Sequence, residues 1–374
     1  MKNFPSVVLL INITFCAARV WNDTGVGTIV FEEAWTIPGI PGGPTTAGQP
    51  VSELQANLLD IHNQRLTQMD ENGIDFMILS CASPCIQGIS DPETAAEMAV
   101  NVNNQLADQI ANNTLRFGGF AALSMHNATE AALELNRTIK ELGFLGALVN
   151  DYQQSGPDND TLIYYDQPGF DVFWQTVTDL DVPVYFHPRD NIPLIQNLQY
   201  SHAPLLIGAV QEFAATLSTH ILGLCTNGVF DRFPNLKVIV GHLGERIPSD
   251  LVRIDTRKAS HHLLFTFLHV TLSPSTYSPG LRVQNPNGLP MQRNVSSYFQ
   301  TNIFETTSGN FATDLLLFHN ITIGLDRILY SIDYPFVDIP DGTTFVNGLV
   351  DVLTPEELLA LKRGRAIDLF KLND

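Results

Sequence analysis

The feature that most constrains the fold is the alternation of short apolar runs with longer helical patterns along all 374 residues. The runs are rich in β-branched and aromatic residues, as strands are, and lie at 28–35, 76–80, 117–123, 145–150, 183–187, 237–242, 299–304 and 328–332. Amphipathic patterns between and after them predict helices at 55–72, 92–111, 128–142, 171–179, 204–223, 310–317 and 354–371. Segments 42–52, 153–168 and 274–288 are rich in Pro, Gly and polar residues and are expected to be loops. The alternation predicts an α/β fold of βαβ units, a single (β/α)8 TIM-barrel domain over residues 27–374.

The composition allows one large core and limits the partners. The chain is 44% hydrophobic and only 16% charged, which suits a single globular domain. Its net charge is -19 and its isoelectric point is about 4.7, so its field repels nucleic acids and anionic membrane surfaces. A small anionic substrate would therefore need a local cation, supplied by a metal ion, by arginine or by both.

The amino terminus resembles a secretory leader. Lys2 precedes an apolar run at 7–11 that continues to residue 15 and ends at small residues, so residues 1–18 are expected to be a signal peptide. The run is too short to span a membrane. N-x-S/T sequons are frequent and start at Asn12, Asn22, Asn112, Asn127, Asn136, Asn159, Asn294 and Asn320. Export of a glycoprotein is the favoured interpretation, and an uncleaved cytoplasmic extension is the alternative.

Cysteine usage leaves two possibilities open. The chain contains Cys16, Cys81, Cys85 and Cys225, and the first would leave with the leader. Cys81 and Cys85 are close enough in sequence for a small loop disulfide, but free buried thiols are equally compatible with the pattern. The spacing does not indicate a zinc knuckle.

Polar side chains stand at the carboxyl ends of several predicted strands. Glu32 lies in the first strand, His187 closes the fifth, His242 closes the sixth and Asp333 follows the eighth. The carboxyl ends of barrel strands carry the chemistry of this fold. Strand alternation turns Glu32 and Ala34 to one side and Glu33 to the other. Glu32, His187 and Asp333 therefore form a candidate set of two oxygen ligands and one nitrogen ligand for a divalent ion, with zinc, manganese and magnesium all possible.

A second pair adds a candidate proton-transfer group. His242 and Glu245 are three residues apart across a glycine-containing turn. The carboxylate can then orient the imidazole, as in many catalytic and metal sites. A purely local turn contact is the alternative.

Together these motifs resemble the decarboxylating branch of the amidohydrolase superfamily, which contains the 2,3-dihydroxybenzoate and γ-resorcylate decarboxylases. The resemblance covers nearly all of 27–372 and rests on residues 32–34, 65–80, 187–189, 228–245, 306–309 and 333–336. Hydrolytic relatives end the first strand in a His-x-His pair, whereas this chain has Glu32 and Ala34. That pair resembles the fungal 2,3-dihydroxybenzoate decarboxylases. It implies one metal ion rather than two, with zinc favoured and manganese or magnesium possible.

The resemblance also implies roles for individual residues. Glu32, His187 and Asp333 match metal ligands, and His242 with Glu245 matches the catalytic histidine and its carboxylate partner. Asp333 would also protonate the ring carbon that carries the carboxylate. Arg253 matches a substrate-binding arginine that serves a neighbouring subunit's site, and an ordinary salt bridge on a helix is the alternative. Relatives imply a homodimer or homotetramer.

The sequence thus predicts a carboxy-lyase that converts an ortho-hydroxybenzoate, such as 2,3-dihydroxybenzoate, to the phenol and carbon dioxide. A mononuclear metal-dependent hydrolase of the lactonase type is one alternative. A secreted barrel that binds a ligand without catalysis is another. The product distinguishes the first alternative, and failure to bind a divalent metal would favour the second.

Overall fold

The computed structural model describes residues 19–41, 51–256 and 291–373. The predicted leader, the loop at 274–288 and most of the loop at 42–52 lie outside these residues. Within them, no helix is both long and apolar enough to cross a membrane.

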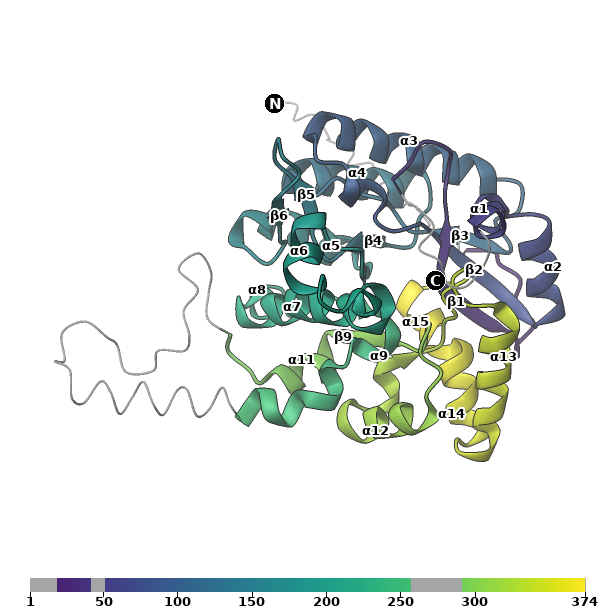
Figure 1. Ribbon diagram of the computed structural model, residues 1–374. Coiled ribbons are helices and arrows are strands. Elements are labelled where there is room, and N and C mark those ends of the chain that lie inside the picture. Colours follow the sequence, from purple (N-terminus) through teal and green to yellow (C-terminus); the bar gives the residue numbers. More distant parts are fainter. Residues whose placement is uncertain (1–18, 42–50, 257–290, 374) are drawn as a thin grey trace, which may run out of the picture.

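Parallel strands surrounded by helices form the predicted (β/α)8 barrel (Figure 1). The barrel strands are β1 (Thr28–Trp35), β2 (Ile74–Cys81), β3 (Phe117–Gly119), β4 (Ala147–Asn150), β7 (Val184–His187), β8 (Val238–Val240), β9 (Ile303–Thr306) and β10 (Ile328–Leu329). They form two ladders, β1-β2-β3 and β10-β9-β8-β7-β4. A parallel bridge between Ala121 and Ala147 joins β3 to β4. The antiparallel pair β5 (Gln153–Ser155) and β6 (Thr161–Ile163) occupies part of the predicted loop at 153–168.

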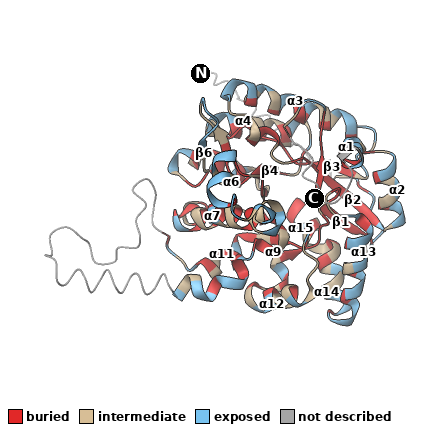
Figure 2. Ribbon diagram, in the orientation of Figure 1, coloured by how far each residue is buried: buried red, intermediate tan, exposed pale blue. Residues whose placement is uncertain are grey.

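Helices pack around the strands and present exposed outer faces (Figure 2). They are α1 (Val51–Leu59), α2 (Gln64–Glu71), α3 (Pro92–Ile110), α4 (Ala128–Glu141), α5 (Asp171–Leu180), α6 (Pro193–Gln199), α7 (Glu212–Thr226), α8 (Val229–Arg232), α9 (Gly241–Gly244), α11 (Val295–Thr301), α12 (Thr313–Ile323), α13 (Ile339–Gly348), α14 (Pro355–Leu359) and α15 (Arg365–Phe370). Residues 247–256 are also helical. Capping side chains fix the starts of α3, α4 and α14. Asp91 accepts a hydrogen bond from Thr94 N, Asn127 accepts one from Thr129 N, and Thr354 accepts one from Glu357 N.

The core has an inner and an outer layer. Phe31, Phe120 and Tyr185 point into the barrel, where Phe370 of α15 packs against the first two. Alternate strand residues such as Val30 face the helices instead. This division is the expected one for a barrel whose interior is filled by side chains.

Several predicted boundaries were wrong. The run at 299–304 is not one strand, since its first residues belong to α11, where Val295, Tyr298 and Phe299 are buried with helical spacing. The helix predicted at 55–72 is split into α1 and α2 at Asp60, whose carboxylate accepts hydrogen bonds from the backbone N–H groups of Asn63 and Arg65.

Two further helices also differ from their predicted extents. The segment 204–223 begins with short 3₁₀ turns, and α7 starts only at Glu212, after Gly208 with φ of +76°. The final helix at 354–371 is α14 and α15 joined by a π-helical turn at Ala360–Gly364.

Candidate metal centre

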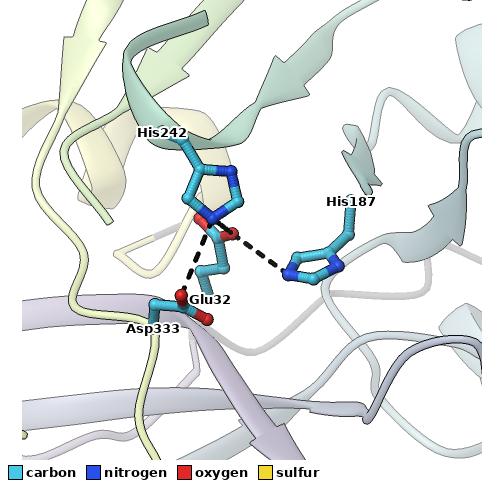
Figure 3. Close-up of side chains that lie close together, drawn as sticks. All are labelled: Glu32, His187, His242 and Asp333. Carbon is cyan, nitrogen blue, oxygen red and sulfur yellow. Dashed lines mark ion pairs between the residues drawn. The ribbon is translucent and has the colours of Figure 1, made fainter. Parts of the chain in front are cut away.

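Four side chains converge at the carboxyl ends of β1, β7, β8 and β10 (Figure 3). They are Glu32, His187, His242 and Asp333, and one ligand atom from each lies within 4.8 Å of the others. The three predicted ligands are thus brought together. His242, which the sequence assigned to catalysis alone, presents its Nε2 atom to the same cluster.

A β-bulge aims Glu32 into the barrel mouth. Ile29 and Phe31 face the interior, so strict alternation would turn Glu32 outward. The register between β1 and β2 shifts between Val30 and Glu33, which places an extra residue in β1. Bulges re-aim side chains in this way. Glu32 and Ala34 consequently share the inner face, as the sequence predicted, and both line the pocket at the barrel mouth.

The two carboxylate oxygens of Glu32 have different surroundings. Oε2 accepts hydrogen bonds from the hydroxyl groups of Tyr185, Thr306 and Ser308. Oε1 is buried and has no hydrogen-bond partner among the described residues. Burial raises the pKa of Glu32 well above its ordinary value, although the charge of His242 and the hydrogen bond from Thr306 act in the opposite direction.

Both histidines direct a ring nitrogen at this oxygen. Oε1 of Glu32 lies 3.4 Å from His187 Nε2 and 3.3 Å from His242 Nε2. A buried carboxylate oxygen without a donor, beside two imidazole nitrogens, is the environment that a divalent cation would complete. The donor atoms present therefore fit one metal ion.

The His187 imidazole is held in its neutral form. Its Nδ1 atom lies 2.6 Å from the carbonyl oxygen of Pro188. Because a carbonyl can only accept, Nδ1 carries the proton and Nε2 keeps a lone pair that faces the cluster. Burial lowers the pKa of His187, which favours the same neutral form.

His242 lies in a strained turn, not at the end of a strand. The strand predicted at 237–242 ends at Val240, and the backbone then turns left-handed, with φ of 54° at His242 and 49° at Glu245. Such backbone costs energy and is typical of functional sites. The turn brings Glu245 Oε1 to 2.7 Å from His242 Nδ1. Burial lowers the pKa of His242, but the charges of Glu32 and Glu245 outweigh it and raise the pKa well above its ordinary value.

Two glycines give this turn its room. A Cβ atom on Gly309 would lie 3.0 Å from His242 Cδ2 and 3.1 Å from Asp333 Oδ2. A Cβ atom on Gly241 would lie 2.7 Å from Glu32 Oε1. Any side chain at either position would push into the cluster.

Glu33, on the opposite side of β1, sets the position of Asp333. Its carboxylate accepts hydrogen bonds from Ser331 Oγ at 2.9 Å, Ile332 N at 3.1 Å and Tyr334 N at 3.0 Å. Ser331 Oγ also accepts hydrogen bonds from the backbone N–H groups of Phe31 and Glu32. These contacts tie β1 to the segment after β10, so Glu32 and Asp333 are fixed against each other.

Sequence reasoning missed the residues that hold Glu32. Tyr185 precedes His187 by two positions in β7, so strand alternation could have placed it on the inner face. Thr306 ends β9 and Ser308 follows it, both in the TTSG motif. That motif supported the family resemblance, but no role was predicted for its hydroxyl groups.

Arg253 is exposed in the helical segment 247–256. It is not among the residues that line the pocket at the barrel mouth. Its predicted contact with a neighbouring subunit's substrate stays a prediction.

The pocket beside the cluster is small and uncharged apart from the candidate ligands. Its lining residues are Glu32, Ala34, Ser80, Cys81, Ala82, Ser83, Leu148, His187, Asp333 and Phe336. None of these described residues is a lysine or an arginine, so the charge of an acidic ligand would be met by a metal ion. Cys81 and Cys85 form a disulfide beside this pocket, the first of the two possibilities that the sequence left open.

Comparisons with known proteins agree with this geometry. Residues 57–372 match the amidohydrolase family. The γ-resorcylate decarboxylase of Polaromonas sp. is 40% identical over 323 residues, covering 86% of this chain and 90% of that protein. The enzyme of the same name from Rhodococcus jostii is 38% identical over 352 residues, covering 93% of this chain and 99% of that protein.

A solved structure of a similar protein contains a metal. The dihydroxybenzoic acid decarboxylase of Polaromonas sp., with bound manganese and the inhibitor 2-nitroresorcinol, is 37% identical and has a TM-score of 0.81, covering 93% of this chain and 98% of that one. The extent of the family match and of these similarities confirms the predicted resemblance. This chain belongs to the amidohydrolase family.

Proposed function

We propose that this protein is a metal-dependent nonoxidative decarboxylase that converts an ortho-hydroxybenzoate to the corresponding phenol and carbon dioxide. The observation that carries the proposal is the buried Oε1 atom of Glu32, which lacks a hydrogen-bond donor among the described residues and faces two imidazole nitrogens. That cation site stands at the barrel mouth of a chain whose similar relatives are named γ-resorcylate decarboxylases.

Glu32, His187 and Asp333 would hold one divalent ion. When bound, such an ion would supply positive charge for the carboxylate and phenolate oxygens of the substrate. The mixed oxygen and nitrogen donors suit zinc, which the sequence favoured, and also manganese, which is bound in the Polaromonas structure. Metal analysis of the purified protein, followed by reconstitution with each ion, decides between them.

Side chains of this protein would carry out the proton transfers of the reaction. Loss of carbon dioxide from an aromatic ring needs a proton on the carboxylated carbon, because departure without it would leave an aryl carbanion. Asp333 borders the pocket and would deliver that proton, which it would regain from water after carbon dioxide leaves. A divalent ion beside Glu32 would offset one of the two charges that raise the pKa of His242. The imidazole, oriented by Glu245 at 2.7 Å, would then be able to assist ionisation of the ortho-hydroxyl group.

The pocket walls would hold the ring. Ala34, Leu148 and Phe336 provide apolar surface beside the candidate ligands. Small walls with few polar groups suit a single aromatic ring whose charged end faces the metal. The names of the relatives favour γ-resorcylate, whereas Glu32 with Ala34 favours 2,3-dihydroxybenzoate, so both belong in the test.

The test is incubation of the metal-loaded protein with a panel of hydroxybenzoates, with detection of carbon dioxide and the phenols. We expect release of one carbon dioxide per phenol, and none with the metal-free protein or the Asp333→Asn variant. Acid release from a lactone without carbon dioxide would instead support the hydrolase alternative. Absence of both reactions and of metal binding would support the noncatalytic alternative.

We also propose export of the chain, with residues 1–18 as its leader. Five sequon asparagines are exposed on the surface, namely Asn22, Asn112, Asn127, Asn159 and Asn294. Exposure is the condition that attachment of a glycan requires. Recovery of the protein from the medium of a eukaryotic host, with a loss of mass on treatment with an N-glycosidase, tests this proposal.

Arg253 would complete a neighbouring subunit's site in a homodimer or homotetramer. Its exposure outside its own chain's pocket supports that arrangement. Sedimentation analysis of the protein and the KM of the Arg253→Ala variant test it. A monomer with full activity would contradict it.

A further inference from the structure

The loop after β2 forms one wall of the pocket at the barrel mouth. Cys81, Ala82 and Ser83 all line this pocket, beside the candidate ligands. The disulfide between Cys81 and Cys85 closes the loop over a sequence separation of 4 residues. Both cysteines are buried. The loop that carries Ser83 is therefore clamped at both ends.

Ser83 shares a hydrogen-bond acceptor with His187. Its Oγ atom donates to the carbonyl oxygen of Pro188 at 2.9 Å. The same oxygen accepts the Nδ1–H group of His187 at 2.6 Å. The carbonyl that fixes the protonated nitrogen and the direction of the His187 ring is thus held in turn by the clamped loop.

Asn150, at the end of β4, supports the same group of atoms. Its Nδ2 atom donates to Ser83 Oγ at 2.9 Å, to the His187 carbonyl oxygen at 3.1 Å and to the Pro188 carbonyl oxygen at 3.2 Å. The ends of β2, β4 and β7 therefore meet at the backbone of one candidate metal ligand. Groups that orient a ligand in this way change metal affinity when they are removed.

We propose that Ser83, clamped by the Cys81–Cys85 disulfide, is a positioning residue for His187, and that the oxidation state of this cysteine pair controls how tightly the site holds its metal. The proposal rests on the proposed function only for the presence of a metal at the cluster. With the disulfide closed, Ser83 holds the Pro188 carbonyl against the His187 ring. With it open, the loop gains freedom and that carbonyl loses a donor.

Reduction of the Cys81–Cys85 disulfide by a phosphine consumes one water molecule and gives two thiols. A phosphine reductant attacks one sulfur and breaks the Sγ–Sγ bond. The phosphorus takes the oxygen atom of one water molecule and becomes the phosphine oxide, while the two protons of that water give two thiols. Unlike a dithiol, this reductant adds no sulfur ligand that would compete for the metal.

The experiment uses the full chain loaded with Co²⁺, whose visible absorption reports the geometry of its ligands. The samples are the untreated protein, the phosphine-treated protein and the variants Ser83→Ala, Ser83→Thr and Cys81→Ser/Cys85→Ser. The double serine variant has no thiols at these positions, so it separates release of the loop from new sulfur ligation. Thermal unfolding of each metal-free protein controls for loss of the fold.

We expect Ser83→Ala, the double serine variant and the reduced protein to bind Co²⁺ about 10- to 100-fold more weakly, with altered absorption. Ser83→Thr keeps the hydroxyl group and should retain the affinity and spectrum of the untreated protein. Wild-type affinity and spectrum in both Ser83→Ala and the double variant would overturn the proposal. If the double variant does not fold, the comparison of alanine with threonine at position 83 still decides.

The same measurements separate this proposal from the proposed function. Tight Co²⁺ binding that depends on Ser83, in a protein that decarboxylates no hydroxybenzoate, would leave the positioning role standing and reject the reaction. Decarboxylation by a protein whose Co²⁺ affinity is independent of Ser83 and of the disulfide would support the reaction and reject the positioning role. Absence of metal binding by the untreated protein would overturn both.

Discussion

Two histidines in this barrel are paired with glutamates in nearly the same way. His242 Nδ1 lies 2.7 Å from Glu245 Oε1, and His319 Nδ1 lies 2.9 Å from Glu305 Oε1. The difference is at the second nitrogen. His242 Nε2 faces Glu32 and Asp333 at 3.3 and 3.6 Å, whereas His319 Nε2 lies 3.0 Å from the hydroxyl oxygen of Ser249.

The surroundings follow this difference. The side chains of His319 and Glu305 are 0% exposed, while that of His242 is 19% exposed at the barrel mouth. Ser249, His319 and Glu305 have the residue types of a hydrolytic triad, but the pocket at the barrel mouth is lined by other residues. The same histidine–glutamate pairing therefore occurs in two different settings. We expect the group that Nε2 faces to decide whether the histidine takes part in chemistry or only stabilises the fold.

Removal of each imidazole in turn should separate the two pairs most clearly. His242→Ala should lower kcat by about 100- to 10,000-fold, the usual worth of a positioned proton-transfer group. Its unfolding free energy should fall less than that of His319→Ala, because the side chain of His242 is 19% exposed whereas that of His319 is 0% exposed. Decarboxylation rates and urea unfolding of the same preparations measure the two effects.

His319→Ala is the matched control and should show the opposite pattern. Removing the ring leaves the fully buried carboxyl group of Glu305 without its partner, which should cost about 3 to 5 kcal/mol of stability. At a temperature where the variant stays folded, kcat should remain near the wild-type value. The double variant Glu305→Leu/His319→Leu should recover most of the loss, since apolar replacement of a buried pair is often neutral.

If instead His319→Ala loses activity while it stays folded, the His319–Glu305 pair has a chemical role, and its assignment to stability alone is wrong. If the double leucine variant is no more stable than the single alanine variant, packing and not the lost partner explains the cost.

The two pairs also mark where prediction from sequence succeeds and fails. Strand runs and their polar ends are local features, so the barrel and the meeting of Glu32, His187 and Asp333 could be predicted. The bulge in β1 and the left-handed turn at His242 could not. Both arise where strands meet their neighbours, and no local propensity favours them.

The pairing of His319 with Glu305 was not predicted either, because it depends on tertiary packing. Glu305 lies in β9 and His319 lies in α12, and only the packing of that helix on the barrel brings them together. The start of the run 299–304 was assigned to a strand because its residues are strand-like. The helical spacing of α11 is visible only when Val295, which precedes the run, is included.

A third buried histidine, His220, differs from His242 and His319 because no carboxylate contacts its Nδ1 atom. His220 donates from Nδ1 to the carbonyl oxygen of Asp151 and accepts the backbone N–H of Tyr165 at Nε2. Burial lowers its pKa to about 4. The unfolded chain, with an ordinary histidine pKa of about 6.5, therefore binds more protons between these values.

The stability that His220 contributes should be complete above pH 6.5 and lost as the pH falls towards 4. The loss should be on the order of 3 kcal/mol, at about 1.4 kcal/mol per pKa unit. Carboxylates titrate in the same range, so the quantity to measure is the difference in unfolding free energy between the wild type and His220→Gln at pH 7 and at pH 4.5. An unchanged difference at the two pH values would show that His220 does not titrate as its environment predicts.

The smallest expected effect concerns Ser249, whose hydroxyl group contacts His319 Nε2. Its side chain is at the surface of the segment 247–256, so water can replace its hydroxyl group at His319 Nε2. Ser249→Ala should therefore cost only about 0.5 to 1.5 kcal/mol, the net worth of one hydrogen bond, and should leave decarboxylation unchanged. A larger loss would mean that Ser249 anchors the start of the helical segment 247–256, which follows the turn at His242. The His319–Glu305 pair would then support the His242–Glu245 pair through the backbone that joins them.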